Sequence, residues 1–280
     1  MPSEQELSNY KEVSLREAQL IMLQILQEID RICKKHRIRY WLDGGTLLGA
    51  VRHQGFIPWD DDLDIAMLRE DYERFLQIAP GELVKPYFLQ TEMNDPFPGA
   101  SYMSKVLYTD SFYWERWHKK KEPFRQCLFV DVFPFDRYPS RGCLLFLELR
   151  NLLAKKKVSY ARNSLGNLWW RFVLLLTKVT GIFSLMKLSK YIVNCLRSKI
   201  LNKPGYIYVS YAPMAPWKEA YLLSEILELT TVSFEGQLFP APRDWHRYLT
   251  KQHGDYMQLP REELRHPPHA RQIMVKAILK

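Results

Sequence analysis

Four aspartates within five residues, at positions 60, 61, 62 and 64, constrain this chain more than any other feature. Carboxylates this close raise one another's pKa and resist removal from water, so they require a cation among them. Mg²⁺ fits, because it takes oxygen ligands and shares its sphere with water and substrate phosphates, and Mn²⁺ is an alternative. The alternation Asp62-Leu63-Asp64-Ile65 predicts a strand with both aspartates on one face and both apolar residues in a core.

The composition describes a globular chain with an excess of positive charge. Its 280 residues are 47% hydrophobic, enough to bury a core, and its formal net charge is +9. Such an excess favours anionic partners, which include nucleotides, phosphorylated polymers, nucleic acid and anionic lipid surfaces. Because no recognised nucleic-acid-binding motif accompanies the charge, we expect no nucleic acid partner.

The cysteines and the apolar segments indicate a cytoplasmic protein. The four cysteines are far apart and form no Cys-x-x-Cys pair, so we expect reduced thiols rather than disulfides or zinc ligands. Residues 1–11 lack the apolar core of a secretory signal. The longest apolar stretch, 168–186, contains Arg171 and Lys178, each of which would cost roughly 2.5–3.5 kcal/mol inside a bilayer. We therefore expect no transmembrane helix.

Hydrophobic periodicity and turn residues predict helices that alternate with strands. Ser14-Leu15-Arg16-Glu17 fits a capping box, and the apolar spacing behind it predicts a helix to about residue 36. Further helices are expected at 46–52, 69–78 and 243–253, with Pro80-Gly81 ending the second of these. Strands are expected at 39–43, 62–65, 87–90, 102–107, 127–133, 206–211 and 231–234. A hairpin turn is expected at Glu235-Gly236, and a polar tail ends the chain.

This pattern predicts an α+β organisation in four parts. A tail of residues 1–12 precedes a catalytic core at 13–138, a basic, Leu- and Trp-rich helical insertion follows at 139–204, and residues 205–280 pack back on the core. The cations of 141–202 have two interpretations. They form either a solvated face or an amphipathic surface on anionic lipid, where each Lys or Arg contributes on the order of 1 kcal/mol.

A double glycine before the aspartates points to phosphate. Gly44-Gly45-Thr46 stands between an expected strand and an expected helix, where backbone amides and a helix N-terminus attract phosphate. Taken alone, the pair is better explained as a structural turn. Together with a metal-binding carboxylate pair, it predicts phosphoryl transfer, which depends on positioning and charge neutralisation.

Other interpretations of the aspartates differ in strength. An EF-hand loop starting at Asp60 fails, because Ile65 stands where glycine is required and Asp71 where glutamate is required. Asp61 is better explained as a turn residue than as a ligand, and Asp60 stays undecided. A glycosyltransferase Asp-x-Asp motif, which holds a nucleotide-sugar through a metal, remains an alternative.

A third carboxylate is usually needed to complete such a metal site or to accept a proton. Asp131 is the candidate, because its apolar neighbours predict a buried strand in which a lone acid needs a cation. The alternative for Asp131 is a buried salt-bridge partner. Asp136, beyond Pro134, is expected to be a turn residue or to support the site from outside the ligand set.

Longer motifs resemble the LicD family of phosphocholine and related phosphotransferases, whose signature is shared by the fukutin-type ribitol-phosphate transferases. The signature covers residues 41–52 (WLDGGTLLGAVR) and 55–64 (GFIPWDDDLD). Similarity continues at Lys105, at 131–134, at 239–242 and at 254–260, and is weakest across 141–202. Two departures concern the C-terminal part: His253 stands where the family often has an aromatic residue, and residues 265–269 follow the family's ending only loosely.

The resemblance implies a nucleotidyltransferase fold similar to DNA polymerase beta, a mixed sheet core flanked by helices. It implies that the donor's phosphates are held by Gly44, Gly45 and Thr46. It implies that the catalytic metal ligands are Asp62, Asp64 and Asp131. Phosphate charge would be neutralised by Arg52 and Lys105, with a surface salt bridge as the alternative for either residue. The roles of Asp60, His53, His253 and His269 stay open.

The resemblance further implies transfer of a phosphocholine-like group from a CDP-alcohol donor to a hydroxyl of a cell-surface glycan, with release of CMP. Acceptors of this kind are lipopolysaccharide, teichoic acid and capsule precursors. Lipid-linked acceptors would place the enzyme as a peripheral protein on the inner face of the plasma membrane. The alternatives are a nucleotide-sugar glycosyltransferase and a membrane-surface scaffold without activity. The transferred group, whether choline, ethanolamine or glycerol, stays open.

Overall fold

The computed structural model describes residues 9–97, 100, 103–117, 122–138, 208–211 and 221–277. The chain divides into two units, Met1–Phe135 together with Ser224–Lys280, and Asp136–Leu223. Most described residues, including the functional site, belong to the first unit. The expected helical insertion at 139–204 lies outside the described residues, and the expected domain boundaries remain predictions.

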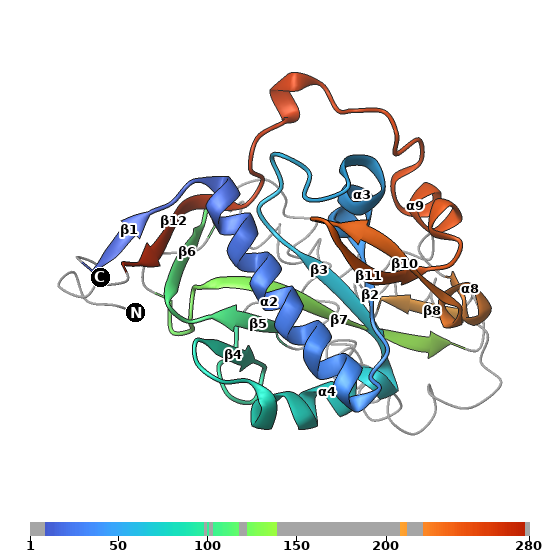
Figure 1. Cartoon of the computed structure of the whole chain (residues 1–280), viewed down its shortest axis with the longest axis horizontal. Helices are drawn as coiled ribbons and strands as arrows, with labels where there is room; N and C mark the ends of the chain where they lie inside the picture. Colours follow the sequence, from blue (N-terminus) through green and yellow to red (C-terminus); the bar gives the residue numbers. More distant parts are fainter. Residues whose placement is uncertain are drawn as a thin grey trace, which may run out of the picture. The chain divides into compact units, whose positions relative to one another are not determined.

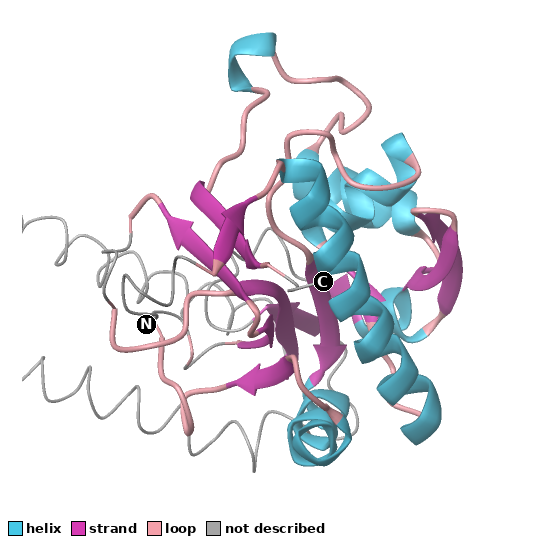
Figure 2. Ribbon diagram, turned by 60° about the vertical axis from the view of Figure 1, so that its left-hand side comes forward, coloured by secondary structure: helices cyan, strands magenta, loops and turns pink. Residues whose placement is uncertain are grey.

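A mixed β-sheet forms the centre of the first unit (Figures 1 and 2). Its strands follow the order β2-β3-β7-β5-β4, and β3 and β7 are parallel while the other neighbours are antiparallel. In that order the strands are Trp41–Leu42, Asp64–Leu68, Leu128–Tyr138, Ser104–Tyr108 and Tyr87–Gln90. The mixed sheet with its helices agrees with the expected α+β class. The similarity to DNA polymerase beta remains a prediction.

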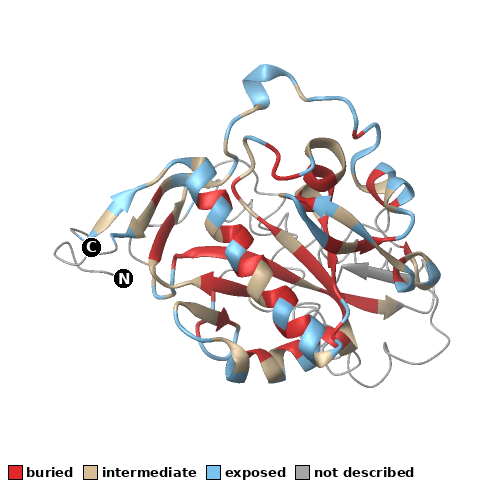
Figure 3. Ribbon diagram, viewed as in Figure 1, coloured by how far each residue is buried: buried red, intermediate tan, exposed pale blue. Residues whose placement is uncertain are grey.

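Helix α2 (Leu15–His36) begins at the predicted capping box. The backbone N–H of Glu17 donates to Ser14 Oγ at 3.2 Å, and the backbone N–H of Ser14 donates to Glu17 Oε2 at 2.8 Å. The helix crosses the sheet, and its buried residues form a stripe along one side (Figures 1 and 3). This stripe carries the predicted apolar spacing, so burial against the sheet rather than propensity alone stabilises the helix.

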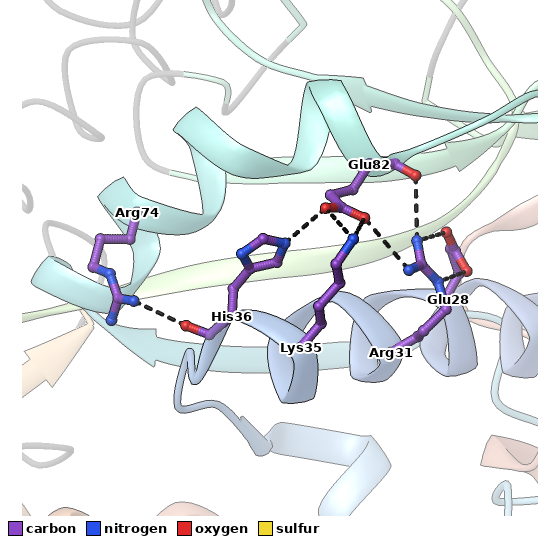
Figure 4. Close-up of polar contacts among 6 residues, drawn as sticks. All are labelled: Glu28, Arg31, Lys35, His36, Arg74 and Glu82. Carbon is purple, nitrogen blue, oxygen red and sulfur yellow. Dashed lines mark hydrogen bonds and ion pairs between the residues drawn. The ribbon is translucent and has the colours of Figure 1, made fainter.

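Helix α4 (Arg69–Glu82) runs beside α2 and is joined to it by charged groups (Figure 4). Glu82 accepts hydrogen bonds from Lys35 Nζ at 2.8 Å and faces His36 Nε2 at 2.7 Å. Lys35 first, and then His36, lower the pKa of Glu82 to about 2. The predicted end at residue 78 was too early: Pro80 lies in the last turn, which closes because Leu83 N–H donates to the Ala79 carbonyl.

The other elements among the described residues are shorter. The helices are α3 (Gly44–His53), α8 (Leu223–Leu227), α9 (Trp245–His253) and the short 3₁₀ helix η2 (Glu262–Leu264). Strands β8 (Tyr208–Tyr211) and β9 (Tyr221–Leu222) pair antiparallel. Strands β10 (Leu229–Phe234) and β11 (Gln237–Pro242) form the predicted hairpin. Its two turn residues, Glu235 and Gly236, both have positive φ, at 52° and 75°, as a tight hairpin turn requires.

The C-terminal segment is a strand, so the expectation of a polar tail was wrong. Strand β12 (Ala270–Lys276) lies between β1 (Tyr10–Glu12) and β6 (Ser111–Glu115) in a three-stranded antiparallel sheet. Ala277 N–H also donates to the Asn9 carbonyl at 2.7 Å. Strand pairing with segments more than 150 residues away orders this part of the chain.

No helix within the described ranges is long and apolar enough to cross a membrane. The apolar stretch at 168–186, for which we also expected no transmembrane helix, lies outside those ranges.

A substitution at Gly49 in α3 tests how tightly this helix packs against the loop that follows it. A Cβ at Gly49 would lie 2.5 Å from the Gly55 carbonyl oxygen and 3.2 Å from the Ile57 nitrogen. Because both are backbone atoms, we expect Gly49→Ala to lower the free energy of unfolding by about 1–3 kcal/mol. Gly81 is the matched control, since its Cβ would meet nothing within 4 Å. Gly81→Ala should leave stability unchanged or raise it by up to about 1 kcal/mol. Equal urea midpoints for the two variants would contradict the expected clash at Gly49.

Candidate active site

The strand register places three of the predicted site residues in one row across the sheet. Asp64 on β3 lies beside Asp131 on β7, and Lys105 on β5 lies on the other side of Asp131. The Asp131 N–H donates to the Leu63 carbonyl at 2.9 Å, which ties the two carboxylate-bearing strands at this point. The proposed third carboxylate is thus next to the aspartate motif in space.

Asp131 and Lys105 form a buried ion pair. Lys105 Nζ lies 3.0 Å from Asp131 Oδ1, and each side chain is 11% exposed. The ammonium also lies over the Phe129 ring, 3.3 Å from its centroid. Burial raises the pKa of Asp131 to about 6, although Lys105 acts in the opposite direction. Asp131 therefore makes the buried salt bridge that we gave as an alternative for it, and it also lies beside Asp64.

The aspartate motif lies more in a loop, and less in a strand, than we predicted. Strand β3 begins only at Asp64, so Asp62 lies in the loop before it. Leu63 and Ile65 are fully buried, as the alternation predicted. Burial raises the pKa of Asp64 well above its usual range, and the charges of Asp62 and Asp131 raise it further.

Asp61 joins the loop to the C-terminal strand, and its interpretation as a turn residue was wrong. Its side chain is fully buried, and Oδ2 accepts the backbone N–H groups of His269 at 2.9 Å and Ala270 at 2.5 Å. The turn hydrogen bond in this loop belongs instead to Asp60, whose N–H donates to the Ile57 carbonyl at 2.9 Å. Asp61 thus makes long-range contacts that no local pattern could indicate.

Asp62 faces His269, a residue whose role the sequence left open. Asp62 Oδ2 lies 3.2 Å from His269 Nε2. Burial acts to raise the pKa of Asp62, but the hydrogen bond from His269 and the charge of that ring, together with Asp60 and Lys105, act against burial and lower the pKa on balance. The same hydrogen bond raises the pKa of His269. The His269 ring also packs edge-on against Trp117, with the ring centroids 5.0 Å apart.

Other distant residues hold the loop in place. The buried side chain of Gln19 on α2 donates to the carbonyls of Ile57 at 3.2 Å and Asp60 at 2.9 Å. Tyr113 Oη donates to the Asp61 carbonyl at 3.1 Å. The loop's backbone is therefore fixed by α2 and β6 before any ligand is considered.

The two glycines at the start of α3 make room for carboxylates. Gly44 has φ of +51°, and a Cβ there would lie 3.0 Å from Asp64 Oδ2. A Cβ at Gly45 would lie 2.8 Å from Asp60 Oδ2. The neighbouring Thr46 is buried, and its Oγ1 accepts the N–H of Asp64 at 2.8 Å. Binding of donor phosphates by these three residues stays a prediction.

Asp43 is a site residue that the analysis of the sequence did not single out. Its carboxylate caps α3 by accepting the Gly44 N–H at 2.8 Å, and it accepts Tyr248 Oη at 2.7 Å and Gln252 Nε2 at 3.0 Å. Burial raises the pKa of Asp43, and these hydrogen bonds oppose the shift. An acidic residue directly before a helix is an N-cap signal that could have identified it.

Arg52 binds protein carbonyls in this structure. Its guanidinium donates to the carbonyls of Tyr256 at 2.7 Å and Gln258 at 3.3 Å, and so holds the loop that follows α9. Burial lowers the pKa of Arg52 while the nearby Asp60 raises it. His53 packs edge-on against Trp59, with centroids 6.0 Å apart. Neutralisation of phosphate charge by Arg52 stays a prediction.

The site as a whole carries more carboxylates than cations. Burial, and then the charge of Asp62, raises the pKa of Asp60 to about 8. Among the described residues, Asp61, Asp62 and His269 form the one group of three potential metal ligands whose ligand atoms all lie within 4.8 Å of one another. Asp62, Asp64 and Asp131 do not form such a group. Fold and site together define an α+β domain with a partly buried cluster in which carboxylates outnumber the basic groups, Lys105 and His269, that pair with them.

Comparison with known proteins assigns this domain to a family. Residues 37–171 match the family model described as the LicD/FKTN/FKRP nucleotidyltransferase domain, so the chain carries a LicD family domain. It is 28% identical to the lipopolysaccharide cholinephosphotransferase LicD of Haemophilus influenzae over 95% of this chain and 99% of that protein.

Two further relatives match over shorter stretches. The human ribitol 5-phosphate transferase FKRP is 49% identical over 38% of this chain and 18% of that protein. An uncharacterized protein of Rickettsia typhi is 45% identical over 49% of this chain and 39% of that protein. The family predicted from the aspartate and glycine motifs is confirmed.

The raised pKa of Asp60 predicts how pH affects stability without divalent cations. Because folding raises this pKa from an unfolded value near 4 to about 8, the native state binds the proton more tightly. The free energy of unfolding should therefore fall as pH rises from 5 to 8 in EDTA. In Asp60→Asn that fall should be smaller by at least about 1.4 kcal/mol, as urea denaturation at both pH values would show. The exposed-site variant Asp110→Asn should behave like the wild type, and the same fall in Asp60→Asn would contradict the assignment.

Tyr248 is expected to support the site through Asp43. Tyr248→Phe removes the hydrogen bond that the hydroxyl donates to buried Asp43 and the one that it accepts from Trp41 Nε1, so we expect the free energy of unfolding to fall by about 1–3 kcal/mol. Tyr87→Phe removes a hydroxyl from a partly exposed strand residue and should change stability by less than about 0.5 kcal/mol. Chemical denaturation of both variants at the same pH distinguishes them, and equal losses would argue against a special role for the bond to Asp43.

Proposed function

We propose that this protein is a phosphotransferase that moves a phosphocholine-like group from a CDP-activated alcohol to a hydroxyl of a cell-surface glycan and releases CMP. One observation carries the proposal: Asp64, Asp131 and Lys105 lie in a single row beside the glycine turn at Gly44 and Gly45. Two relatives support transfer of a phosphate-containing group, since LicD of Haemophilus influenzae is a cholinephosphotransferase and human FKRP is a ribitol 5-phosphate transferase.

The carboxylate cluster fits Mg²⁺, with Mn²⁺ as an alternative. Asp62, Asp64 and Asp131 would hold the ion, because they offer oxygen ligands and because burial makes their joint ionisation unfavourable without positive charge. Their spacing leaves the ligand set open, so we expect these side chains to draw together around the ion. Such an ion would neutralise charge on the donor's phosphates.

The protein's own residues would position the donor and the acceptor. Gly44 and Gly45 open α3, where backbone amides and the helix N-terminus favour phosphate. Lys105, which is buried beside Asp131, adds positive charge at the row. A hydroxyl oxygen of the acceptor would bond to the donor phosphorus while the bond to the CMP oxygen breaks. Asp131, whose pKa is raised to about 6, would align this hydroxyl and accept its proton.

We propose a peripheral location on the inner face of the plasma membrane, where lipid-linked glycan acceptors would be reached. The formal net charge of +9 supports an anionic surface as a partner. The basic segment at 141–202, which we proposed for this contact, lies outside the described residues. A glycan or glycolipid acceptor, such as a lipopolysaccharide, teichoic acid or capsule precursor, completes the proposed set of partners.

The double variant Asp62→Asn/Asp64→Asn tests the proposal. Incubated with Mg²⁺, a glycan acceptor and a panel of CDP-alcohols, the wild type should show acceptor-dependent CMP release. The double variant should lose at least about a thousandfold in rate, because charge neutralisation dominates phosphoryl transfer. Asp110→Asn removes a partly exposed carboxylate that pairs with Lys276 and should keep wild-type rates. Circular dichroism of the three proteins would show whether each is folded.

Three outcomes would reject parts of the proposal. Retained transfer by the folded double variant would reject the metal assignment. A glycosidic bond in the product, in place of a phosphodiester, would favour the nucleotide-sugar glycosyltransferase. Failure of the wild type to bind any CDP-alcohol in the presence of Mg²⁺ would favour the scaffold without activity.

A further inference from the structure

The C-terminal segment adds an imidazole to the aspartate loop. His269 precedes β12 and is 207 residues beyond Asp62, yet its Nε2 lies 3.2 Å from Asp62 Oδ2. Ligand atoms of Asp61, Asp62 and His269 all lie within 4.8 Å of one another. This group mixes nitrogen with oxygen, whereas the site in the proposed function is made of carboxylates alone.

Three contacts fix His269 in this place. Its backbone N–H donates to Asp61 Oδ2 at 2.9 Å, and the next N–H, of Ala270, donates to the same oxygen. Its ring packs edge-on against Trp117. Its Nε2 then faces Asp62. The backbone, the ring plane and one ring nitrogen of His269 are thus each held by a contact.

The distance between Asp62 and His269 suits two ligands of one ion. Two adjacent ligands of an octahedral ion with bonds of about 2.1 Å are about 3.0 Å apart. The separation of 3.2 Å between His269 Nε2 and Asp62 Oδ2 is close to this value.

Asp61 supplies an independent observation. The residue is fully buried, and its Oδ1 has no hydrogen-bond partner although its Oδ2 has two. A buried acceptor without a partner is costly, and such an atom calls for a bound ion or water. The unsatisfied oxygen belongs to the same residue that positions His269.

We infer that Asp61, Asp62 and His269 form a cation position of their own, which takes a divalent ion that accepts nitrogen ligands, such as Mn²⁺ or Zn²⁺. Imidazole suits Zn²⁺ in particular, and Mn²⁺, which prefers oxygen, serves as the paramagnetic probe of the same position, while Mg²⁺ takes oxygen ligands. The position shares Asp62 with the carboxylate site of the proposed function but uses neither Asp64 nor Asp131. It therefore stands whether or not the transfer reaction is the one proposed.

Pulsed EPR of bound Mn²⁺ tests the inference, because nitrogen coordination produces a coupling that oxygen ligands do not. The full chain, stripped of metal with EDTA and then given Mn²⁺ alone, should show coupling to an imidazole nitrogen. His269→Gln should lose that coupling and bind Mn²⁺ roughly ten- to a hundredfold more weakly. The fold should survive, because Asp61 bonds the backbone at 269 and 270 rather than the ring. His266→Gln, on the same segment, is the matched control and should keep the coupling.

Two results would overturn the inference: a wild type without nitrogen coupling, or a His269→Gln variant that keeps it. Either would leave His269 as an ion-pair partner of Asp62 only. Asp64→Asn separates this outcome from failure of the proposed function. It should lose transfer activity while it keeps the nitrogen coupling. Retained transfer by Asp64→Asn would count against the proposed function alone.

Discussion

The neighbouring carboxylates of Asp64 and Asp131 are the constraint on which the rest of this structure depends. Parallel pairing of β3 with β7 sets them side by side in the interior, where burial raises the pKa of both and the charge of Asp131 raises the pKa of Asp64 further. Apolar residues at these two positions would remove the charge from the buried strands. The fold instead surrounds the pair with Lys105, a polar loop and two glycines, which is the arrangement of a site that binds charge rather than of a core.

The start of α3 leaves room for the carboxylate oxygens of this site. The left-handed backbone at Gly44 and the missing side chain at Gly45 let carboxylate oxygens approach the start of α3 to distances that a Cβ would obstruct. Asp43 caps the same helix and is held from α9 by Tyr248, so the C-terminal part of the chain supports the glycine turn. The turn therefore has two functions in this fold, as a helix start and as the wall of an acidic site.

The sequence predicted the parts of this site that follow local rules, and it missed those that depend on distant contacts. The capping box at Ser14, the hairpin turn at Glu235 and the buried strand around Asp131 all carry their signals within a few residues. The alternation around Asp64 placed its apolar neighbours correctly for the same reason. Asp61 was assigned to a turn because its partners, the N–H groups at 269 and 270, are more than 200 residues away and belong to a segment without strong periodicity.

The contacts that order the aspartate loop also close the fold. Asp61 binds the first residues of β12, and β12 in turn pairs with β1 near the N-terminal end of the described chain. Bringing together groups so far apart in sequence costs loop entropy, which grows only slowly with loop length. Two charge-assisted hydrogen bonds to one buried carboxylate, together with the strand pairing that continues from them, offset this cost. The carboxylates before β3 thus contribute to the fold as well as to the site. One of them, Asp61, attaches the C-terminal strand to the loop.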